Sequence, residues 1–228
     1  MAETASNRRK WILEKGPKIS AVTDKFPPLE EFDMVMKEFA FCIGKGSTEV
    51  TATLKKNWSV WISKIVQKAQ LETSHRNTLF QGYSGLIDRF STMTPEELPQ
   101  SPDASFAIFI VAKLMKSSDA LILVLENGDN IVDEIEKRNI AAPYIIQAGP
   151  ANARQYFLVA ENIVYVEVDD FLQAVAAVVG LYYVYNVVYP KQWNNCLLFM
   201  EKKLLGITSG PSINALPAGV ISDIEKIP

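Results

Sequence analysis

The sequence predicts an α+β fold that is mostly helical, with a small antiparallel sheet packed against a central apolar helix. Residues 156–168 contain two β-rich runs on either side of a polar turn, a pattern typical of a β-hairpin. Residues 171–189 follow without a charged side chain, and a helix that is apolar on every side is typical of a protein core. Most other apolar residues recur at helical spacing, so we expect helices elsewhere.

Helices account for the amino-terminal half of this prediction. Two short ones are expected over residues 8–15 and 19–26, because Gly16-Pro17 and Pro27-Pro28 interrupt the chain. The next helix has apolar side chains at helical spacing: Phe32, Val35, Met36, Phe39 and Ile43. A long amphipathic helix then begins at Ser47 or Thr48, and a weaker helical pattern covers residues 74–92.

The carboxy-terminal half mixes helices and strands. Helices are expected over residues 104–118, 130–139 and 192–207, and a short strand is expected over residues 142–149. The pattern of residues 119–125 fits either a helix or a strand. In the hairpin, the turn is expected near Glu161-Asn162, since asparagine tolerates left-handed backbone geometry.

The apolar run 171–189 raises the question of a membrane span, because about 20 helical residues can just cross a bilayer. Its tyrosines and the polar Gln173 and Asn186 lie within the run, which favours a buried core helix. Asp169 or Asp170 is expected to cap this helix, and Pro190 to end it. Gly180 in the middle of the helix predicts the close approach of another element.

The domain organisation is predicted from composition. Residues 94–103 hold three prolines and are expected to link a helical region, 8–93, to an α+β region, 104–207. Charge changes at the same place: residues 1–90 carry 14 basic and 10 acidic side chains, whereas residues 91–228 carry 9 and 16. Disorder is expected at residues 1–7, and a flexible tail at residues 208–228.

Composition also limits the setting of the protein. The net charge is −3 and 48% of the residues are hydrophobic, which is ordinary for a globular chain. The two cysteines are too few for a disulfide framework, and no apolar secretory segment follows the first basic residues. We therefore expect an intracellular protein, cytoplasmic or nuclear, without a membrane partner.

No stretch of the sequence matches a catalytic, cofactor or metal motif. His75 is the single histidine, which rules out a site with two histidine ligands. The segment GYSGL at 82–86 lacks the second glycine of a nucleophile elbow, and CIGKGST at 42–48 lacks the order of a phosphate-binding loop. We expect no catalytic residue, no cofactor and no metal, and a non-enzymatic role is the favoured interpretation.

Three stretches resemble a known group of proteins. They are ILEKGPKISAVTDKFPPL at 12–29, APYIIQAGPANARQYFLVAENIVYVEVDDF at 142–171 and AVAAVVGLYYVYNVVYPKQ at 174–192. In this order they resemble the carboxy-terminal region of animal proteins labelled sterile alpha motif domain-containing protein 3-like, over residues 8–205. The resemblance implies no catalytic residues. Members often carry a sterile alpha motif domain upstream, and we expect no contribution from one here.

The favoured function is a protein-interaction or assembly module, with a protein partner or a second copy bound. Its candidate surface is a stripe at i, i+3, i+4 and i+7 of the central helix, where aromatic hydroxyls could find a partner: Tyr182, Tyr185, Asn186 and Tyr189. Packing of these side chains in the core is the other interpretation.

Nucleic-acid binding is the alternative function. The basic amino-terminal half would contact phosphates through Arg8, Arg9, Lys10, Lys55 and Lys56. Such a role fits a protein of mobile-element origin. A solvated helix face explains the same residues without any ligand.

Overall fold

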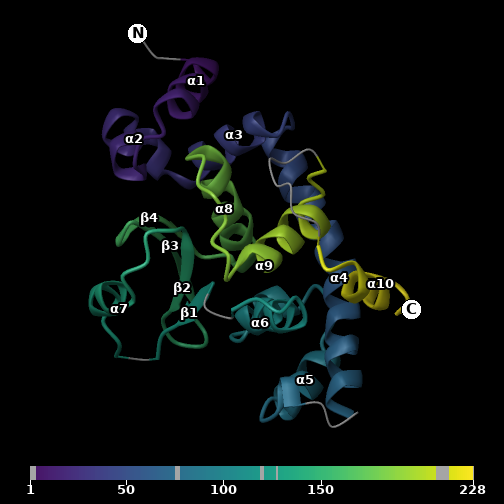
Figure 1. The fold of residues 1–228 in the computed structure, drawn as a ribbon. Helices are drawn as coiled ribbons and strands as arrows, with labels where there is room; N and C mark the ends of the chain where they lie inside the picture. The colour runs from purple at the N-terminus through teal and green to yellow at the C-terminus, as the bar shows by residue number, and fades with distance from the viewer. Residues whose placement is uncertain (1–3, 75–77, 119–120, 127, 209–215, 228) are drawn as a thin grey trace. The chain divides into compact units, whose positions relative to one another are not determined.

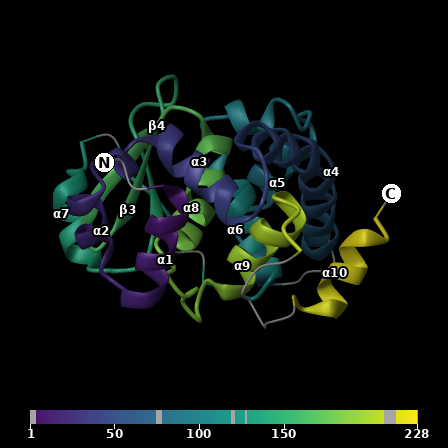
Figure 2. The same ribbon diagram turned by 90° about the horizontal axis from the view of Figure 1, so that it is seen from above.

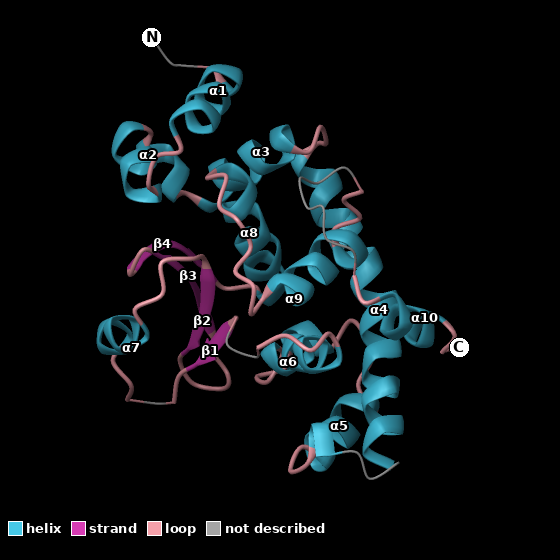
Figure 3. Cartoon of the chain, in the orientation of Figure 1, coloured by secondary structure: helices cyan, strands magenta, loops and turns pink. Residues whose placement is uncertain are grey.

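A computed structural model gives the fold of the chain (Figure 1) and describes residues 4–74, 78–118, 121–126, 128–208 and 216–227. The chain forms two compact units. The first contains residues 1–52 and 123–190, and the second contains residues 53–122 and 191–228. The fold class is the predicted one, because helices predominate and the strands form one small sheet (Figure 3).

The first unit holds the sheet and the helices around it. Its helices are α1 (Ala5–Lys15), α2 (Ile19–Lys25), the 3₁₀ turn η1 (Pro27–Glu30), α3 (Phe32–Cys42), α7 (Ile131–Arg138) and α8 (Phe171–Val184). Its strands are β1 (Ile122–Val124), β2 (Tyr144–Ala148), β3 (Gln155–Ala160) and β4 (Ile163–Val168). The first residue of β1, Ile122, is grouped with the second unit. The segment 119–125 thus contains a strand, while residues 119–120 lie outside the described part.

The predicted hairpin is confirmed. β3 and β4 pair antiparallel and are joined by Glu161 and Asn162, which both have positive φ, 50° and 62°. Positive φ at both central residues is what a tight two-residue hairpin turn requires. A glutamate is unusual there, and its carboxylate offers a reason. It accepts hydrogen bonds from the backbone N–H groups of Ile19 and Ser20, at 3.0 and 3.1 Å, and so caps the first turn of α2.

The sheet has the strand order β1-β2-β3-β4, and β2, β3 and β4 are antiparallel neighbours. The register between β3 and β4 shifts once, so that Tyr165 is the extra residue of a bulge. α8 packs on one side of the sheet, and Figures 1 and 2 place α7 on the other. All five residues of β2 are therefore buried.

Helix α8 is the core of the first unit. Every one of its residues except Gln173 is buried, as the absence of charge predicted. Its neighbours are α3 and the strands β2, β3 and β4. The Asp170 side chain caps its first turn by accepting from the Gln173 N–H at 2.8 Å.

The predicted end of this helix was wrong. α8 ends at Val184 rather than at Tyr189, because Asn186 adopts left-handed geometry with φ 55°. The N–H groups of Asn186 and Val187 then bond back to the carbonyls of Tyr183 and Tyr182, at 3.3 and 2.9 Å, which closes the helix in a Schellman motif. Pro190 lies beyond this stop, so it does not end the helix.

The second unit is built from helices. α4 (Ser47–Ser74) begins in the first unit and continues here, followed by η2 (Thr78–Phe80), α5 (Ser84–Ser91), η3 (Leu98–Gln100), α6 (Ser105–Leu114), α9 (Asn194–Phe199), a π-helical turn (Met200–Leu204) and α10 (Ala218–Glu225). α6 packs on α9. In the first turn of α9 the Cys196 N–H donates a hydrogen bond to the Ser117 hydroxyl at 3.0 Å. Trp61 of α4 contacts the ring of Phe199 edge to face, at 5.6 Å.

The predicted linker does not separate the two units. Leu98 and Ser101 are buried inside the second unit, and Arg89 forms an ion pair with Asp103. Each unit takes its residues from both halves of the sequence, so the division into 8–93 and 104–207 was wrong. Composition reports only local segments, whereas these units arise from contacts between segments far apart in the chain.

The predicted ends of the ordered region also change. α1 begins at Ala5, so residues 5–7 are helical, and the Thr4 side chain caps them. The tail contains α10, whose last turn is held by Lys64, with its ammonium donating to the Glu225 carbonyl at 3.2 Å. Residues 1–3 and 209–215 lie outside the described part. Among the described helices, none combines the length and the hydropathy needed to cross a bilayer.

Gly180 lies where another element approaches closely, as predicted. A Cβ atom at this position would come within 3.3 Å of the ring of Phe39 on α3, which is itself fully buried. The glycine lets the two helices pack with that ring between them. Its cost to helix propensity, about 1 kcal/mol relative to alanine, is offset by this packing.

We expect Gly180→Leu to lower the free energy of unfolding by about 1–3 kcal/mol, because the added side chain overpacks the contact with Phe39. Chemical denaturation followed by circular dichroism measures the change. Gly85→Leu is the control, since a Cβ there meets no atom within 4 Å. We expect it to leave stability unchanged or to raise it by up to about 1 kcal/mol, because leucine has the higher helix propensity. Higher stability of Gly180→Leu than of the wild type would contradict the packing described here.

Candidate functional site

The tyrosine stripe of the central helix is not a surface. Tyr182 and Tyr185 are buried, and their hydroxyls donate to the carbonyls of Pro143 at 2.7 Å and Leu29 at 2.9 Å. Burial raises the pKa of both phenols. Asn186 is exposed as the helix stop, and Tyr189 packs its ring against Tyr182 with centroids 4.9 Å apart. Core packing, the other interpretation of this stripe, therefore holds for Tyr182 and Tyr185, whereas Asn186 is exposed and Tyr189 is half-buried.

The five residues predicted to contact nucleic acid differ in their contacts and lie in two different units. Arg8 donates to Glu38 of α3 at 2.7 Å, in an ion pair whose side chains are only 16% and 4% exposed. Arg9 donates to the carbonyls of Tyr183 and Val184, at 2.5 and 3.4 Å. Lys10 is exposed in the first unit, whereas Lys55 and Lys56 are exposed on α4 in the second. Arg8 and Arg9 are thus bound to other elements of the first unit, and Lys10 lies 3.9 Å from Glu14 on its own helix.

The contact of Arg9 has a clear electrostatic reason. The last carbonyls of a helix carry partial negative charge and lack partners inside the helix. Arg9 donates to two of them at the end of α8, of which the Tyr183 carbonyl also accepts from the Asn186 N–H. The basic pair Arg8-Arg9 therefore fixes α1 to α3 and α8 at once.

Metal and nucleophile candidates receive no support. Among the residues that the structure describes, no group of three or more histidine, cysteine, aspartate or glutamate side chains could hold a metal ion. His75 lies outside the described residues. Ser84 begins α5 after a turn rather than after a strand, so the strand-to-helix context of a nucleophile elbow is missing.

A hollow of about 470 Å³ lies between α1 and α3. Its lining comes almost entirely from α1: Ser6, Arg9, Lys10, Leu13 and Glu14, with Phe41 from α3. We call it the α1/α3 groove. Leu13 and Phe41 are 52% and 46% exposed, although both are large apolar side chains. They place apolar surface from two helices in one concave site.

The walls of the groove are held rigidly. The Arg8–Glu38 ion pair ties α1 to α3, and Ile12 of α1 is completely buried. Trp11 packs edge to face on Phe26 at 5.8 Å, with the Lys25 ammonium 4.2 Å from the centre of its ring. Contacts of Arg8, Trp11 and Ile12, which share one face of α1, therefore keep Leu13 in place beside Phe41.

Sequence reasoning missed this groove. It assigned no role to Leu13 or Phe41. One signal was present: Phe41 does not belong to the apolar stripe that includes Val35, Met36 and Phe39, so its ring points away from the core face. The position of α1 beside it depends on contacts between residues about 30 positions apart, which no local pattern reports.

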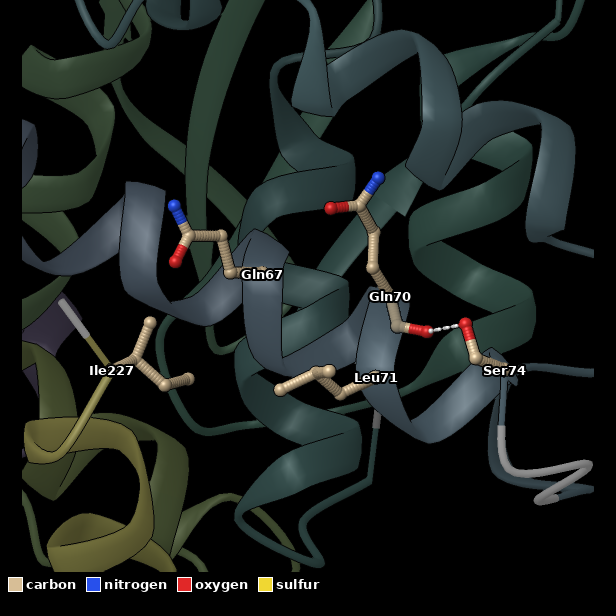
Figure 4. A pocket seen from close by; sticks show the side chains of 5 residues that line it. All are labelled: Gln67, Gln70, Leu71, Ser74 and Ile227. Atoms are coloured by element: carbon tan, nitrogen blue, oxygen red, sulfur yellow. Dashed lines mark hydrogen bonds between the residues drawn. The ribbon is translucent and has the colours of Figure 1, made fainter.

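A second hollow, of about 500 Å³, lies in the second unit (Figure 4) and is lined by Gln67, Gln70, Leu71, Ser74 and Ile227. The Ser74 hydroxyl is used within α4, donating to the Gln70 carbonyl at 2.9 Å. In the view of Figure 4 the two glutamine amides point away from Leu71 and Ile227. Leu71 is its single strongly exposed apolar side chain, so the α1/α3 groove is the better candidate.

Cys42 follows Phe41 at the end of α3 and is partly exposed. Burial raises the pKa of its thiol, the positive charge of Arg9 opposes this shift, and the negative charge of Glu38 adds to it. Cys196, in the second unit, is fully buried and its pKa is raised to about 12. Cys42 is therefore the more accessible of the two thiols, but not an activated one.

We expect Glu38→Gln to lower the free energy of unfolding by about 1.5–3 kcal/mol, since the partly buried guanidinium of Arg8 loses its carboxylate. Thermal and chemical denaturation measure the loss. Glu14→Gln is the matched control on α1, because Glu14 is 57% exposed and lies 3.9 Å from Lys10. Its effect should stay below about 1 kcal/mol. Equal effects of the two variants would show that the ion pair does not fix α1.

The Cys42 thiol should react with iodoacetamide more slowly than a peptide thiol at neutral pH, because a raised pKa lowers the fraction of thiolate at every pH below it. The half-maximal alkylation rate should accordingly come at a higher pH than for the peptide. Mass spectrometry follows the reaction, and Cys42→Ser should abolish it while Cys196 stays unmodified. A half-maximum at or below the pH of the peptide thiol would contradict this assignment.

Comparison with protein-family models, with curated proteins and with solved structures finds no match to the chain. The resemblance to the sterile alpha motif domain-containing protein 3-like group stays a prediction. The function of the protein is therefore inferred from the geometry and the charges of the α1/α3 groove.

Proposed function

We propose that this protein is a non-enzymatic protein-interaction module that docks a partner in the α1/α3 groove. One observation carries the proposal: two large apolar side chains, Leu13 and Phe41, are about half exposed on the two walls of one hollow. A concave apolar site on rigid elements favours binding, because little side-chain freedom is lost when the partner docks.

The energetics describe a modest, reversible interaction. Complete burial of a leucine or phenylalanine side chain contributes about 1.5–3 kcal/mol. Leu13 and Phe41 are about half exposed, so covering them would contribute about half of that amount each. A micromolar complex requires about 8 kcal/mol. The partner must therefore also contact the polar rim of the groove.

Nucleic-acid binding draws less support. Arg8 and Arg9 donate to groups of the chain itself, and the net charge of the whole chain is −3. Lys10, Lys55 and Lys56 stay exposed, but they belong to different units. Binding through phosphate contacts would weaken steeply with added salt, which separates it from docking on Leu13 and Phe41.

The test replaces both apolar walls. We expect the double variant Leu13→Asp/Phe41→Asp to bind the partner at least about tenfold more weakly than the wild type, since it puts charge where apolar surface is buried. Partners are found by affinity purification and then re-measured with purified components. Val188→Asp is the control, because Val188 is 85% exposed in the same unit and outside the groove.

Circular dichroism must show that both variants keep the wild-type melting curve. Sedimentation at several concentrations tests whether the partner is a second copy of the chain. If every interaction of the wild type survives in the double variant, the groove is not the docking site and the proposal is wrong.

A further inference from the structure

We infer that the α1/α3 groove accepts a short amphipathic helix with acidic residues beside its apolar face. This inference rests on the proposed docking function and names the class of partner. Three properties of the groove lead to it: the secondary structure of its walls, their length and the charges around them.

The walls exclude an extended partner. Both are helices, and the N–H and carbonyl groups in the middle of α1 and α3 are already bonded within those helices. No strand contributes to the lining of the groove. An extended peptide would therefore bury its own backbone groups without partners, at a cost that a helix avoids by bonding internally.

The length of the groove suits a short helix. α1 has 11 residues, so its wall is about 16 Å long at a rise of about 1.5 Å per residue. A partner of about three turns matches it and presents apolar side chains at i, i+3 or i+4 and i+7 on one face. Such a stripe would pack between Leu13 and Phe41.

The charges favour an acidic partner. Arg9 and Lys10 line the groove, and exposed Lys37 lies one helical turn before Phe41 on α3. The opposing charge in the lining is Glu14, 3.9 Å from Lys10. Arg9 is bonded to carbonyls rather than to a carboxylate, so its positive charge is only partly balanced.

Acidic side chains near the groove are fewer than the basic ones, or are already paired with a basic side chain. Asp33 lies in the first turn of α3, one turn before Lys37 and two turns before Phe41. Glu49 lies 3.6 Å from Lys45, and Glu38 is bound to Arg8. The rim of the groove is therefore net positive, and a partner with carboxylates beside its apolar stripe is complementary to it.

The experiment selects short random peptides displayed on phage against the full chain, with counter-selection on Leu13→Asp/Phe41→Asp. We expect the selected peptides to carry apolar residues at helical spacing and more Asp and Glu than Lys and Arg. Fluorescence anisotropy then measures affinity at low and high salt. Replacing the acidic residues of a selected peptide by amides should weaken its binding about tenfold at low salt.

A variant of the rim provides the matched control. Lys10→Gln/Lys37→Gln leaves Leu13 and Phe41 in place, so it should bind the acidic peptide and its amide form equally weakly. Nuclear magnetic resonance of the bound peptide should show helical structure.

Other outcomes separate this inference from the proposed function. Selected peptides that are proline-rich, extended or basic, but still depend on Leu13 and Phe41, would overturn the acidic helix and leave the docking groove standing. Two further results would overturn the acidic helix and leave the docking groove standing. One is sedimentation of the wild type, but not of the double variant, with phosphatidylserine vesicles. The other is self-association of the wild type that the double variant loses. If no selected peptide depends on Leu13 and Phe41, the docking function itself is wrong.

Discussion

The burial of α8, complete except at Gln173, is the constraint on which the rest of the first unit depends. A helix covered on every side must be apolar, must give each buried polar group a partner and must have its end satisfied. Tyr182 and Tyr185 meet the second condition by donating to Pro143 and Leu29. Arg9 meets the third by donating to the last carbonyls of the helix. The core helix thereby determines which surface segments must come to it.

The position of α1 follows from these requirements. Arg9 donates to carbonyls at the end of α8, and Arg8 donates to the buried carboxylate of Glu38 on α3. Two adjacent arginines therefore attach α1 to both α8 and α3. Ile12 is then buried, while Leu13, the next residue, faces outward beside Phe41. The groove is thus a consequence of how a largely polar helix is attached by its charges, rather than of a dedicated apolar stripe.

The proposed role of the groove agrees with this arrangement. The attachment of α1 to α3 through Arg8 and Glu38 holds Leu13 in the same hollow as Phe41, with Arg9 and Lys10 in the lining. A partner that covers only the apolar side chains of the groove would bind weakly. A partner whose carboxylates also contact Lys10 and Lys37 would bind more tightly. Charge around a small apolar centre gives selectivity without requiring a large interface.

The sequence by itself determined the features that are set by neighbouring residues. These are the hairpin turn at Glu161-Asn162, the Asp170 cap, the burial of α8 and the close approach at Gly180. Tertiary structure decided the others. The use of Arg8 and Arg9, the division into two units and the α1/α3 groove all depend on segments distant in the chain. The physical reason is that a charged or apolar side chain has the same local signature whether it faces solvent or a partner, and only the fold supplies that partner.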